Sequence, residues 1–401
     1  MHLASYAIVA AAAAIATGLT VPLVRALSFR IGAVAEPGER HIHLNATPRL
    51  GGVSMFVGMS VGLVVAAAMT DFRAVFDTPI DIVGVFAAAF VIFVTGLIDD
   101  IRELSAPAKL AGMVLAGSVM TLSGLSIVNV PIPFLGFTVL SPDLAAFVTV
   151  LWVVLLANAI NLIDGLAGLA AGLVAIAAGA FLLYGIRLDR AGALFTDNMG
   201  PLLAAVVVGM CVGFLPWNFH PASIFMGDGG ALLLGLLLAA STTSVGGQSD
   251  NSYTGQSWFF FAPIIIPLLI LGVPLIDILF AIVRRASKRT VFSTADKEHI
   301  HHRLMRLGHG QRGSVLILWT FTALLSAFAL APAIMGSGSG ILPISIAAFT
   351  LLAVTFLLPR LRRSERRSET ARERATDALG EEIEAPAGSL EPIDTRNGSA
   401  Q

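Results

Sequence analysis

The feature that most constrains this chain is a succession of apolar segments separated by short polar stretches. A run of roughly 20 mainly apolar residues is the length that a helix needs to cross the hydrocarbon core of a bilayer. Eleven segments qualify: 3–26, 51–70, 80–98, 107–125, 144–160, 168–186, 199–216, 230–247, 258–283, 314–334 and 340–358. The sequence therefore predicts an all-α fold, a polytopic membrane bundle of about eleven transmembrane helices.

The composition agrees with this class and argues against a water-soluble protein. Of the 401 residues, 56% are hydrophobic and only 13% are charged, whereas a soluble domain needs more charge to cover its surface. The single cysteine, Cys211, leaves no disulfide framework and no thiolate metal site. The first apolar segment is too long for the core of a signal peptide, so we expect it to remain as a span.

The positions of lysine and arginine predict how the bundle is oriented. With the N-terminus outside, 22 of the 25 basic residues fall on the inner side, as the positive-inside rule requires. The C-terminus is then cytoplasmic, and the protein is placed in the inner (plasma) membrane. We expect a transmembrane catalytic domain at 1–358, followed by a disordered, charged cytoplasmic tail at 359–401.

Polar side chains gather on the same predicted side. Seven of the eight histidines lie there, and so do the carboxylates that directly follow or precede apolar segments. They fall into five stretches: 27–50, 99–106, 158–168, 217–229 and 284–313. This distribution predicts one cytoplasmic-face site.

The motif GLIDDIRELS places Asp99 and Asp100 at the inner end of the third segment. Neighbouring residues of a helix point about 100° apart, so the pair cannot grip one small ion from a regular helix. One carboxylate could bind a cation while the other handles a proton, or both form a solvated charged helix end. Lys109, in the next segment, either extends harmlessly to the interface or meets a phosphate.

The motif LLANAINLIDGLAGL places Asn158, Asn161 and Asp164 on one helix face. Carboxamides suit the edge of a nucleobase or sugar, although they also serve as hydrogen-bonding contacts between membrane helices. Gly165 and Gly168 are expected to break the helix and let a ligand approach the backbone.

In the motif WNFHPASIFMGDGGALLLG, Asp228 stands between glycines just ahead of a predicted span. The start of a helix favours anionic ligands. A carboxylate there is useful if a cation bridges it to phosphate, in the manner of magnesium. The alternative is a simple helix cap.

Two basic loops complete the set. The loop 284–313 carries His299, His301, His302 and Arg303, which suit a diphosphate better than zinc because the zinc pattern is missing. The first inner loop carries Arg40, His41, His43 and Arg49. An intramembrane acid, Asp277, either pairs with Arg284 or Arg285 or contributes to the site.

Together, the ordered motifs RHIHLNATPRLGG, GLIDDIRELS, NAINLIDGLAGL, IFMGDGGALLLG and DKEHIHHRL resemble the polyprenyl-phosphate N-acetylhexosamine-1-phosphate transferases. The resemblance runs from about residue 27 to 313. It implies transfer of a sugar-1-phosphate, most simply GlcNAc-1-phosphate, from a UDP-sugar to a polyprenyl phosphate with release of UMP. The implied cofactor is Mg2+, with Mn2+ as a substitute. The implied partners are the two substrates and the membrane, with no nucleic acid; a homodimer stays open.

The resemblance also implies roles for individual residues. Asp99 and Asp100 would meet the lipid phosphate, and Asp228, together with Asp99, would hold the metal. The histidines of the second basic loop, His299, His301 and His302, would act at the sugar nucleotide. The remaining implied substrate contacts are Asn158, Asn161, Asp164, Gly165, Arg303, Arg40, His43, Arg49, Lys109 and Asn218.

The sequence departs from the family pattern at three positions. Ala167 stands where a second aspartate is usual, Glu36 where Asp is usual, and Ala46 where Pro is usual. None affects the aspartate pair or Asp228. HIHHRL resembles the GlcNAc branch rather than the pentapeptide branch. Direct displacement is favoured over a covalent intermediate, because the lipid phosphate is already ionised and needs mainly positioning.

Two other protein classes fit the sequence less well. A secondary transporter predicts acids spread along the spans and repeat symmetry, whereas the acids here crowd one face. A phosphotransferase of the CDP-alcohol type needs a DG-AR-G spacing that is missing after Asp164-Gly165. The same chemistry with UDP-MurNAc-pentapeptide or another UDP-hexosamine is the nearer alternative.

Overall fold

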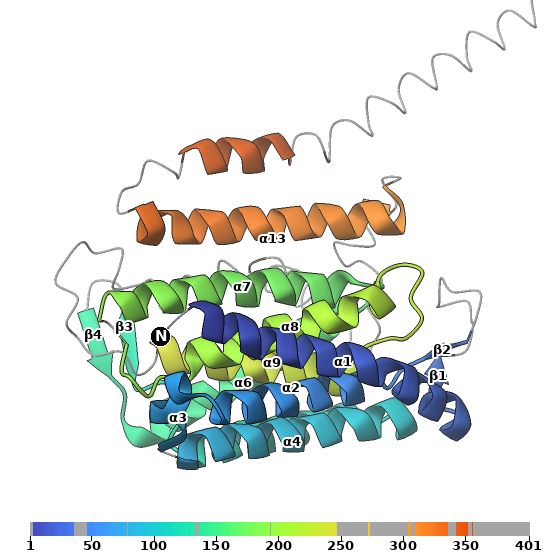
Figure 1. Ribbon diagram of the computed structural model, residues 1–401, viewed down its shortest axis with the longest axis horizontal. Coiled ribbons are helices and arrows are strands. Elements are labelled where there is room, and N and C mark those ends of the chain that lie inside the picture. The colour runs from blue at the N-terminus through green and yellow to red at the C-terminus, as the bar shows by residue number, and fades with distance from the viewer. Residues whose placement is uncertain are drawn as a thin grey trace, which may run out of the picture. The chain divides into compact units, whose positions relative to one another are not determined.

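The computed structural model describes residues 3–35, 46–77, 79–132, 136–192, 194–246, 272, 304–305, 309–335, 342–351 and 355. The chain divides into two compact units, Met1–Leu351 and Leu352–Gln401, and every element below belongs to the first. Figure 1 shows a bundle of long helices with two small sheets at its ends. The prediction of a helical membrane bundle is confirmed, while the two sheets were not foreseen.

The helices in chain order are α1 (Leu3–Ile31), α2 (Gly51–Ala67), the short 3-10 helix η1 (Thr70–Phe72), α3 (Arg73–Asp77), α4 (Pro79–Arg102), α5 (Ala106–Leu122), α6 (Pro142–Ile163), α7 (Leu169–Arg190), α8 (Gly200–Asn218), α9 (Gly227–Gly246) and α13 (Gly310–Met335). Strands β1 (Val34–Ala35) and β2 (Thr47–Pro48) pair antiparallel, as do β3 (Asn129–Ile132) and β4 (Gly136–Val139). A further helix covers Leu342–Leu351.

Seven of these helices are long and apolar enough to cross a bilayer: α1, α4, α6, α7, α8, α9 and α13. An eighth span results if α2 and the segment Thr70–Asp77, which bends away by 93°, count as one. α5 and Leu342–Leu351 are apolar but shorter. The predicted segment 258–283 lies outside the described residues, so the total of eleven spans stays a prediction.

Proline and glycine set several helix starts. Pro107 occupies the first turn of α5 and Pro142 the first turn of α6, where the missing N–H of proline costs nothing because it would have no helical partner. α7 starts directly after Gly168, whose φ of +82° is readily adopted only by glycine. Polar residues near these positions, such as Lys109 and Asp164, therefore lie at helix ends.

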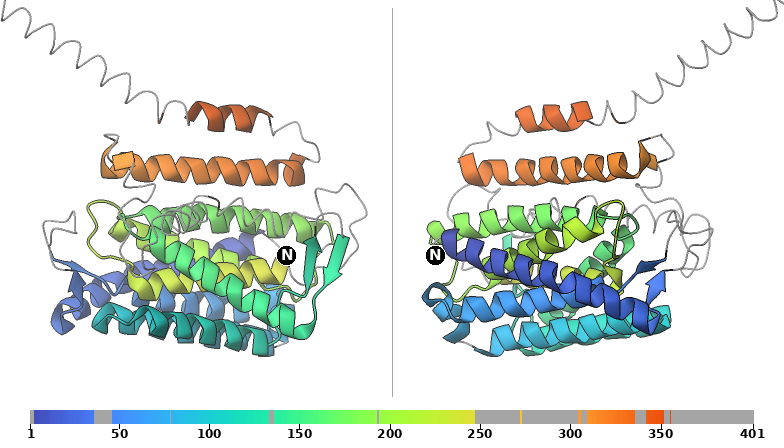
Figure 2. Two further views of the ribbon diagram at one scale, coloured as in Figure 1. Left: turned by 180° about the vertical axis from the view of Figure 1, so that it is seen from behind. Right: turned by 45° about the vertical axis from the view of Figure 1, so that its right-hand side comes forward.

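Helix α9 forms the centre of the bundle. All of its residues from Gly229 to Gly246 are buried, and it packs against α2, α4, α6 and α8. Figure 2 shows the same bundle from two further sides. Small residues permit these close approaches: a Cβ at Gly96 of α4 would lie 2.5 Å from the carbonyl carbon of Asp228. Such contacts are typical of membrane helices, which associate by packing rather than by hydrophobic drive.

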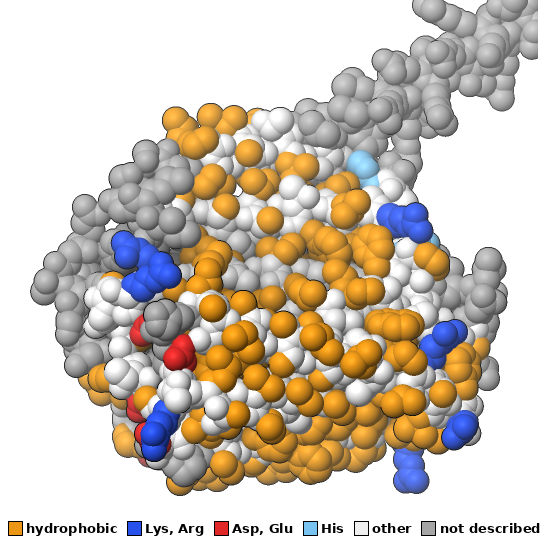
Figure 3. Space-filling model, in the orientation of Figure 1, with side chains coloured by type: hydrophobic (Ala, Val, Ile, Leu, Met, Phe, Trp, Pro, Cys, Tyr) orange, Lys and Arg blue, Asp and Glu red, His pale blue; other side chains and the backbone are white. Residues whose placement is uncertain are grey.

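The outer helices present apolar side chains to their surroundings. On α1, Leu19 and Leu23 are 71% and 72% exposed. In Figure 3, hydrophobic side chains cover the middle of the face shown and charged side chains lie toward its two ends. This is the surface that a bilayer requires.

We expect Gly52→Ala to destabilise the bundle, because a Cβ at Gly52 of α2 would collide with the backbone nitrogen of Gly230 in α9. Overpacking of this kind costs about 1–3 kcal/mol. Thermal unfolding in detergent measures the effect. The matched control is Gly179→Ala in α7, where the nearest atom to the new Cβ is 3.9 Å away; equal stability of both variants would contradict the close approach.

Candidate functional site

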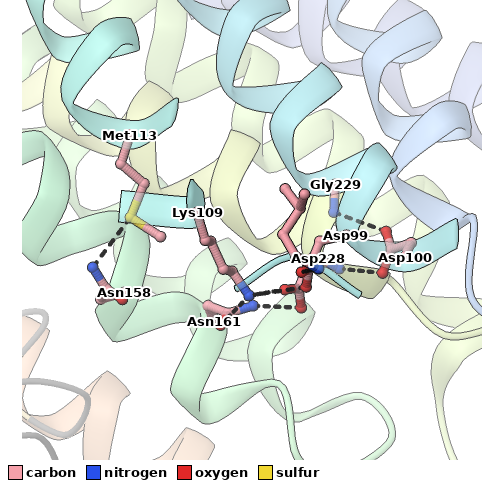
Figure 4. A network of polar contacts seen from close by, with 9 residues as sticks. Asp99, Asp100, Lys109, Met113, Asn158, Asn161, Asp228 and Gly229 are labelled. Atoms are coloured by element: carbon pink, nitrogen blue, oxygen red, sulfur yellow. Dashed lines mark hydrogen bonds and ion pairs between the residues drawn. The ribbon is translucent and has the colours of Figure 1, made fainter. Parts of the chain in front are cut away.

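Four helix ends meet at one end of the bundle and bring together a group of polar side chains (Figure 4). We call it the carboxylate–lysine cluster: Asp99 and Asp100 from the last turn of α4, Lys109 from the first turn of α5, Asn161 from the last turn of α6, and Asp228 from the first turn of α9. Five of the residues singled out in the sequence are thus neighbours in space.

Lys109 is the centre of this cluster. Its Nζ pairs with Oδ2 of Asp228, lies 3.3 Å from Oδ2 of Asp99, and donates to Oδ1 of Asn161 at 3.3 Å. Asn161 in turn donates from Nδ2 to Oδ1 of Asp228 at 2.7 Å. Of the two alternatives for Lys109, the structure therefore has the lysine pointing into the cluster.

The adjacent aspartates of α4 face different partners. Asp99 accepts from the Leu104 N–H through Oδ1 at 2.6 Å and turns Oδ2 to Lys109. Asp100 accepts from the N–H groups of Asp228 and Gly229, at 2.8 and 2.9 Å. The expected divergence of neighbouring helical side chains is confirmed.

The start of α9 differs from the expectation. The helix start at Asp228 was predicted to favour an anionic ligand. Instead, the anion at this helix start is the carboxylate of Asp100, and a Cβ at Gly227 would meet Asp100 Oδ2 at 2.5 Å. Glycine is needed at position 227 because the Arg49 carbonyl and the Asp100 carboxylate approach its backbone closely.

The Asn158–Asp164 stripe is only partly drawn into the cluster. Asn161 reaches it, whereas Asn158 donates to the Val154 carbonyl at 2.8 Å and to the sulfur of Met113 at 3.2 Å. Asp164 follows the last residue of α6; burial raises the pKa of its carboxyl well above the ordinary value, and the negative charge of Asp100 adds to the rise. Exposed Gly165 follows it.

Asn218 braces two loops that border the cluster. Its side chain is buried, with Oδ1 accepting from the Gly168 N–H at 2.9 Å and Nδ2 donating to the Ile224 carbonyl at 3.0 Å. The sequence interpretation did not foresee this brace, and the substrate contact it assigned to Asn218 stays a prediction. A lone amide at the end of an apolar helix, followed by a proline-containing loop, was the available signal.

Of the histidines and arginines singled out above in the two basic loops, Arg49 is the one that the structure describes. Its backbone N–H donates to Ala33, and its charge acts on Asp100 together with that of Lys109. The others singled out there lie outside the described residues: Arg40, His41, His43, His299, His301, His302 and Arg303. The same holds for Asp277, Arg284 and Arg285.

The cluster suits a magnesium ion held by few protein ligands better than a metal held by protein ligands alone. Within the part of the chain that the structure describes, no three His, Cys, Asp or Glu side chains converge as a metal group. However, magnesium commonly takes one or two carboxylates and completes its shell with water and substrate phosphates. Oxygens of Asp99, Asn161 and Asp228 already surround one ammonium group, and such hard oxygen donors suit this ion.

Fold and cluster together define a polytopic membrane protein with a carboxylate-rich polar site at the ends of its spans. Residues 82–246, which contain all five residues of the cluster, match Glycosyl transferase family 4. Relatives at 37–38% identity cover 78–90% of the chain. The chain belongs to this family.

Three relatives illustrate the match. The decaprenyl-phosphate N-acetylglucosaminephosphotransferase of Mycobacterium tuberculosis is 38% identical over 90% of both chains. A Bacillus subtilis protein named "Probable undecaprenyl-phosphate N-acetylglucosaminyl 1-phosphate transferase" is 37% identical over 78% of this chain and 80% of its own. The phospho-N-acetylmuramoyl-pentapeptide-transferase of Desulforudis audaxviator is 32% identical over 78% of this chain and 92% of its own.

Replacing Asn218 by alanine should lower the free energy of unfolding by about 1–3 kcal/mol for each buried group left without a partner. Two buried groups would lose their partner, the Gly168 N–H and the Ile224 carbonyl. Thermal unfolding measures the effect. Asn218→Asp keeps an acceptor for Gly168, so its stability should lie between those of the wild-type protein and the alanine variant. Unchanged stability of the alanine variant would contradict the bracing role.

Proposed function

We propose that this protein transfers GlcNAc-1-phosphate from UDP-GlcNAc to a polyprenyl phosphate. An oxygen of the lipid phosphate attacks the phosphorus that bears the sugar, and the bond from that phosphorus to the bridging oxygen breaks. UMP leaves, and polyprenyl-diphosphate-GlcNAc forms, which is the first membrane step of a cell-envelope polysaccharide. The carrying observation is the convergence of Asp99, Lys109, Asn161 and Asp228 in a chain similar along nine-tenths of its length to an enzyme named for this acceptor and sugar.

The relatives favour GlcNAc over a larger donor. Those named for N-acetylglucosamine match at 37–38% identity, while three named for the pentapeptide donor match at 25–32%. Their acceptors differ, being decaprenyl phosphate in one name and undecaprenyl phosphate in the other. Both lipids therefore belong in the assay.

The cluster supplies the groups that such a displacement needs. Phosphoryl transfer depends on positioning and on neutralising charge. Asp228 and Asp99 would hold a magnesium ion, for which Mn2+ would substitute, and the ion supplies neutralisation of the diphosphate. Lys109 would turn to phosphate oxygens, because its ammonium is the positive charge between the carboxylates. Asn161 orients Asp228 through the 2.7 Å hydrogen bond.

The remaining predicted contacts complete the proposal. Asp164 and Gly165, at the end of α6, and Asn158, one turn earlier, would border the nucleotide. The histidines His299, His301 and His302, with Arg303, Arg40 and His43, would approach the diphosphate from the two basic loops. Direct displacement is preferred, because the lipid phosphate is already ionised near neutral pH.

We also propose an eleven-span topology with the N-terminus outside and the cluster facing the cytoplasm from the inner membrane. The excess of basic residues on that side supports it. The loop before α9 is hydrogen-bonded to strand β2 of the first inner loop, Phe225 N–H to Pro48 at 2.8 Å. In the described helices, acidic residues lie at helix ends, which argues against a transporter pathway along the spans.

Purified protein with magnesium and either polyprenyl phosphate should release UMP from UDP-GlcNAc. Asp228→Asn should lower the rate by about 10²–10³-fold, the scale for losing one key electrostatic group. UMP release and transfer of radiolabelled sugar into extractable lipid measure the reaction. The matched control is Asp143→Asn, an exposed carboxylate at the start of α6, which should keep its rate.

Two outcomes would count against these assignments. Transfer that persists in excess chelator would remove the metal from the proposal. Transfer from UDP-MurNAc-pentapeptide but not from UDP-GlcNAc would reassign the donor.

Cysteine labelling tests the orientation. The native Cys211 is buried, so a Cys211→Ser background with either Glu103→Cys or Asp143→Cys carries one exposed thiol. A membrane-impermeant maleimide should label position 143 in intact cells, and position 103 only after permeabilisation, because the positive-inside rule places them on opposite faces. The reverse pattern would invert the topology.

A further inference from the structure

We infer that Asp100 is a positioning residue: from α4 it caps the start of α9 and thereby holds Asp228 in place. The inference rests on the proposed function for its meaning, because Asp228 is the proposed metal ligand. It separates the roles of the two adjacent aspartates, which the family resemblance treats as one catalytic pair.

The first support is where the oxygens of Asp100 point. Oδ1 accepts from the Asp228 N–H and Oδ2 from the Gly229 N–H, at 2.8 and 2.9 Å. N–H groups of a first helical turn have no partner inside the helix, and the positive end of the helix dipole favours a carboxylate. Both oxygens of Asp100 are therefore engaged by α9.

The second support is that α9 lacks a cap of its own. The residues just before Asp228 are Phe225, Met226 and Gly227, and none has a side chain that can accept a hydrogen bond from the first turn as Ser, Thr, Asn or Asp would. The cap comes from a residue 128 positions earlier in the chain. The local sequence alone would leave this helix start without a side-chain cap.

The third support is that α4 contacts the backbone of Asp228 at two points. While Asp100 holds the N–H, Gly96 lies so close that a Cβ there would sit 2.6 Å from the Asp228 carbonyl oxygen. The Asp228 side chain then reaches Asn161 at 2.7 Å and pairs with Lys109. The direction of this carboxylate thus depends on the contact between α4 and α9.

The contrast with Asp99 completes the argument. Asp99 turns an oxygen to Lys109, on the side where Asp228 also presents its carboxylate. Asp100 faces the backbone of α9 instead. Asp99 is placed to meet substrate or metal, and Asp100 is placed to hold Asp228.

The test compares Asp100→Asn with Asp99→Asn by hydrogen exchange at the start of α9. Asn at 100 keeps one acceptor but loses the charge and the second hydrogen bond, so the amides of 228 and 229 should exchange roughly 10-fold faster or more. Asp99→Asn should leave these amides unchanged. Glu103→Gln, which removes an exposed carboxylate just after the end of α4, is the control for charge loss.

Metal binding and kinetics provide the second readout. Asp100→Asn should weaken Mn2+ binding, followed by electron paramagnetic resonance, by about 10-fold, and should lower kcat without altering the shape of the pH–rate profile. In an Asp228→Asn background, adding Asp100→Asn should lower Mn2+ affinity and kcat little further, because the effects of two residues that act through one group are not additive. Asp100→Glu should recover part of the Mn2+ affinity.

Two results would overturn the inference. One is unchanged exchange at 228 and 229 in Asp100→Asn. The other is loss of the acidic limb of the pH–rate profile in Asp100→Asn with normal Mn2+ affinity, which would make Asp100 an acid–base group. If the wild-type protein releases no UMP, the proposed function fails, whereas the exchange and Mn2+ measurements still test the cap.

Discussion

The close packing of α9 at the centre of the bundle is the constraint on which the rest of the structure depends. Its residues from Gly229 onward are buried, and backbones meet at Gly52 with Gly230, Gly96 with Asp228, and Gly235 with Ala157. Helices in lipid gain little from hydrophobic burial against one another, so close approach and interhelical hydrogen bonds hold them. The first turn of α9, which carries Asp228, inherits its position from this packing.

That position creates an unusual balance of charge at the end of the spans. Four carboxylates lie close together there: Asp99, Asp100, Asp164 and Asp228. Among the described residues, the cations that act on Asp100 are Lys109 and Arg49. Carboxylates withdrawn from water resist sharing a site unless cations compensate them. The arrangement is therefore suited to a divalent ion and a phosphate-bearing substrate, for which Lys109 and the two basic loops offer further positive charge.

Much of the fold could be predicted from apolar segments, because the length and composition of a span are local properties of the chain. Each predicted segment within the described residues overlaps an observed helix. The residue types of the site were also predictable, since carboxylates and amides at the ends of apolar helices are costly without a function. What could not be predicted was the partner of each group. Asn158 donates to the sulfur of Met113, and Asn218 joins Gly168 to Ile224; their contacts with substrate stay predictions.

By itself, the sequence determined the membrane class, the predicted face of the polar residues and the family, because hydropathy, basic residues and ordered motifs are written in the chain. Only the tertiary structure decided that Asp99 faces Lys109 while Asp100 faces α9, and that the Asp100 carboxylate packs against the glycines around Asp228. The reason is physical: a side chain's direction follows from its helix, but its partner follows from how helices far apart in sequence pack. The contact between Asp100 and Asp228 spans 128 residues, and no local pattern encodes it.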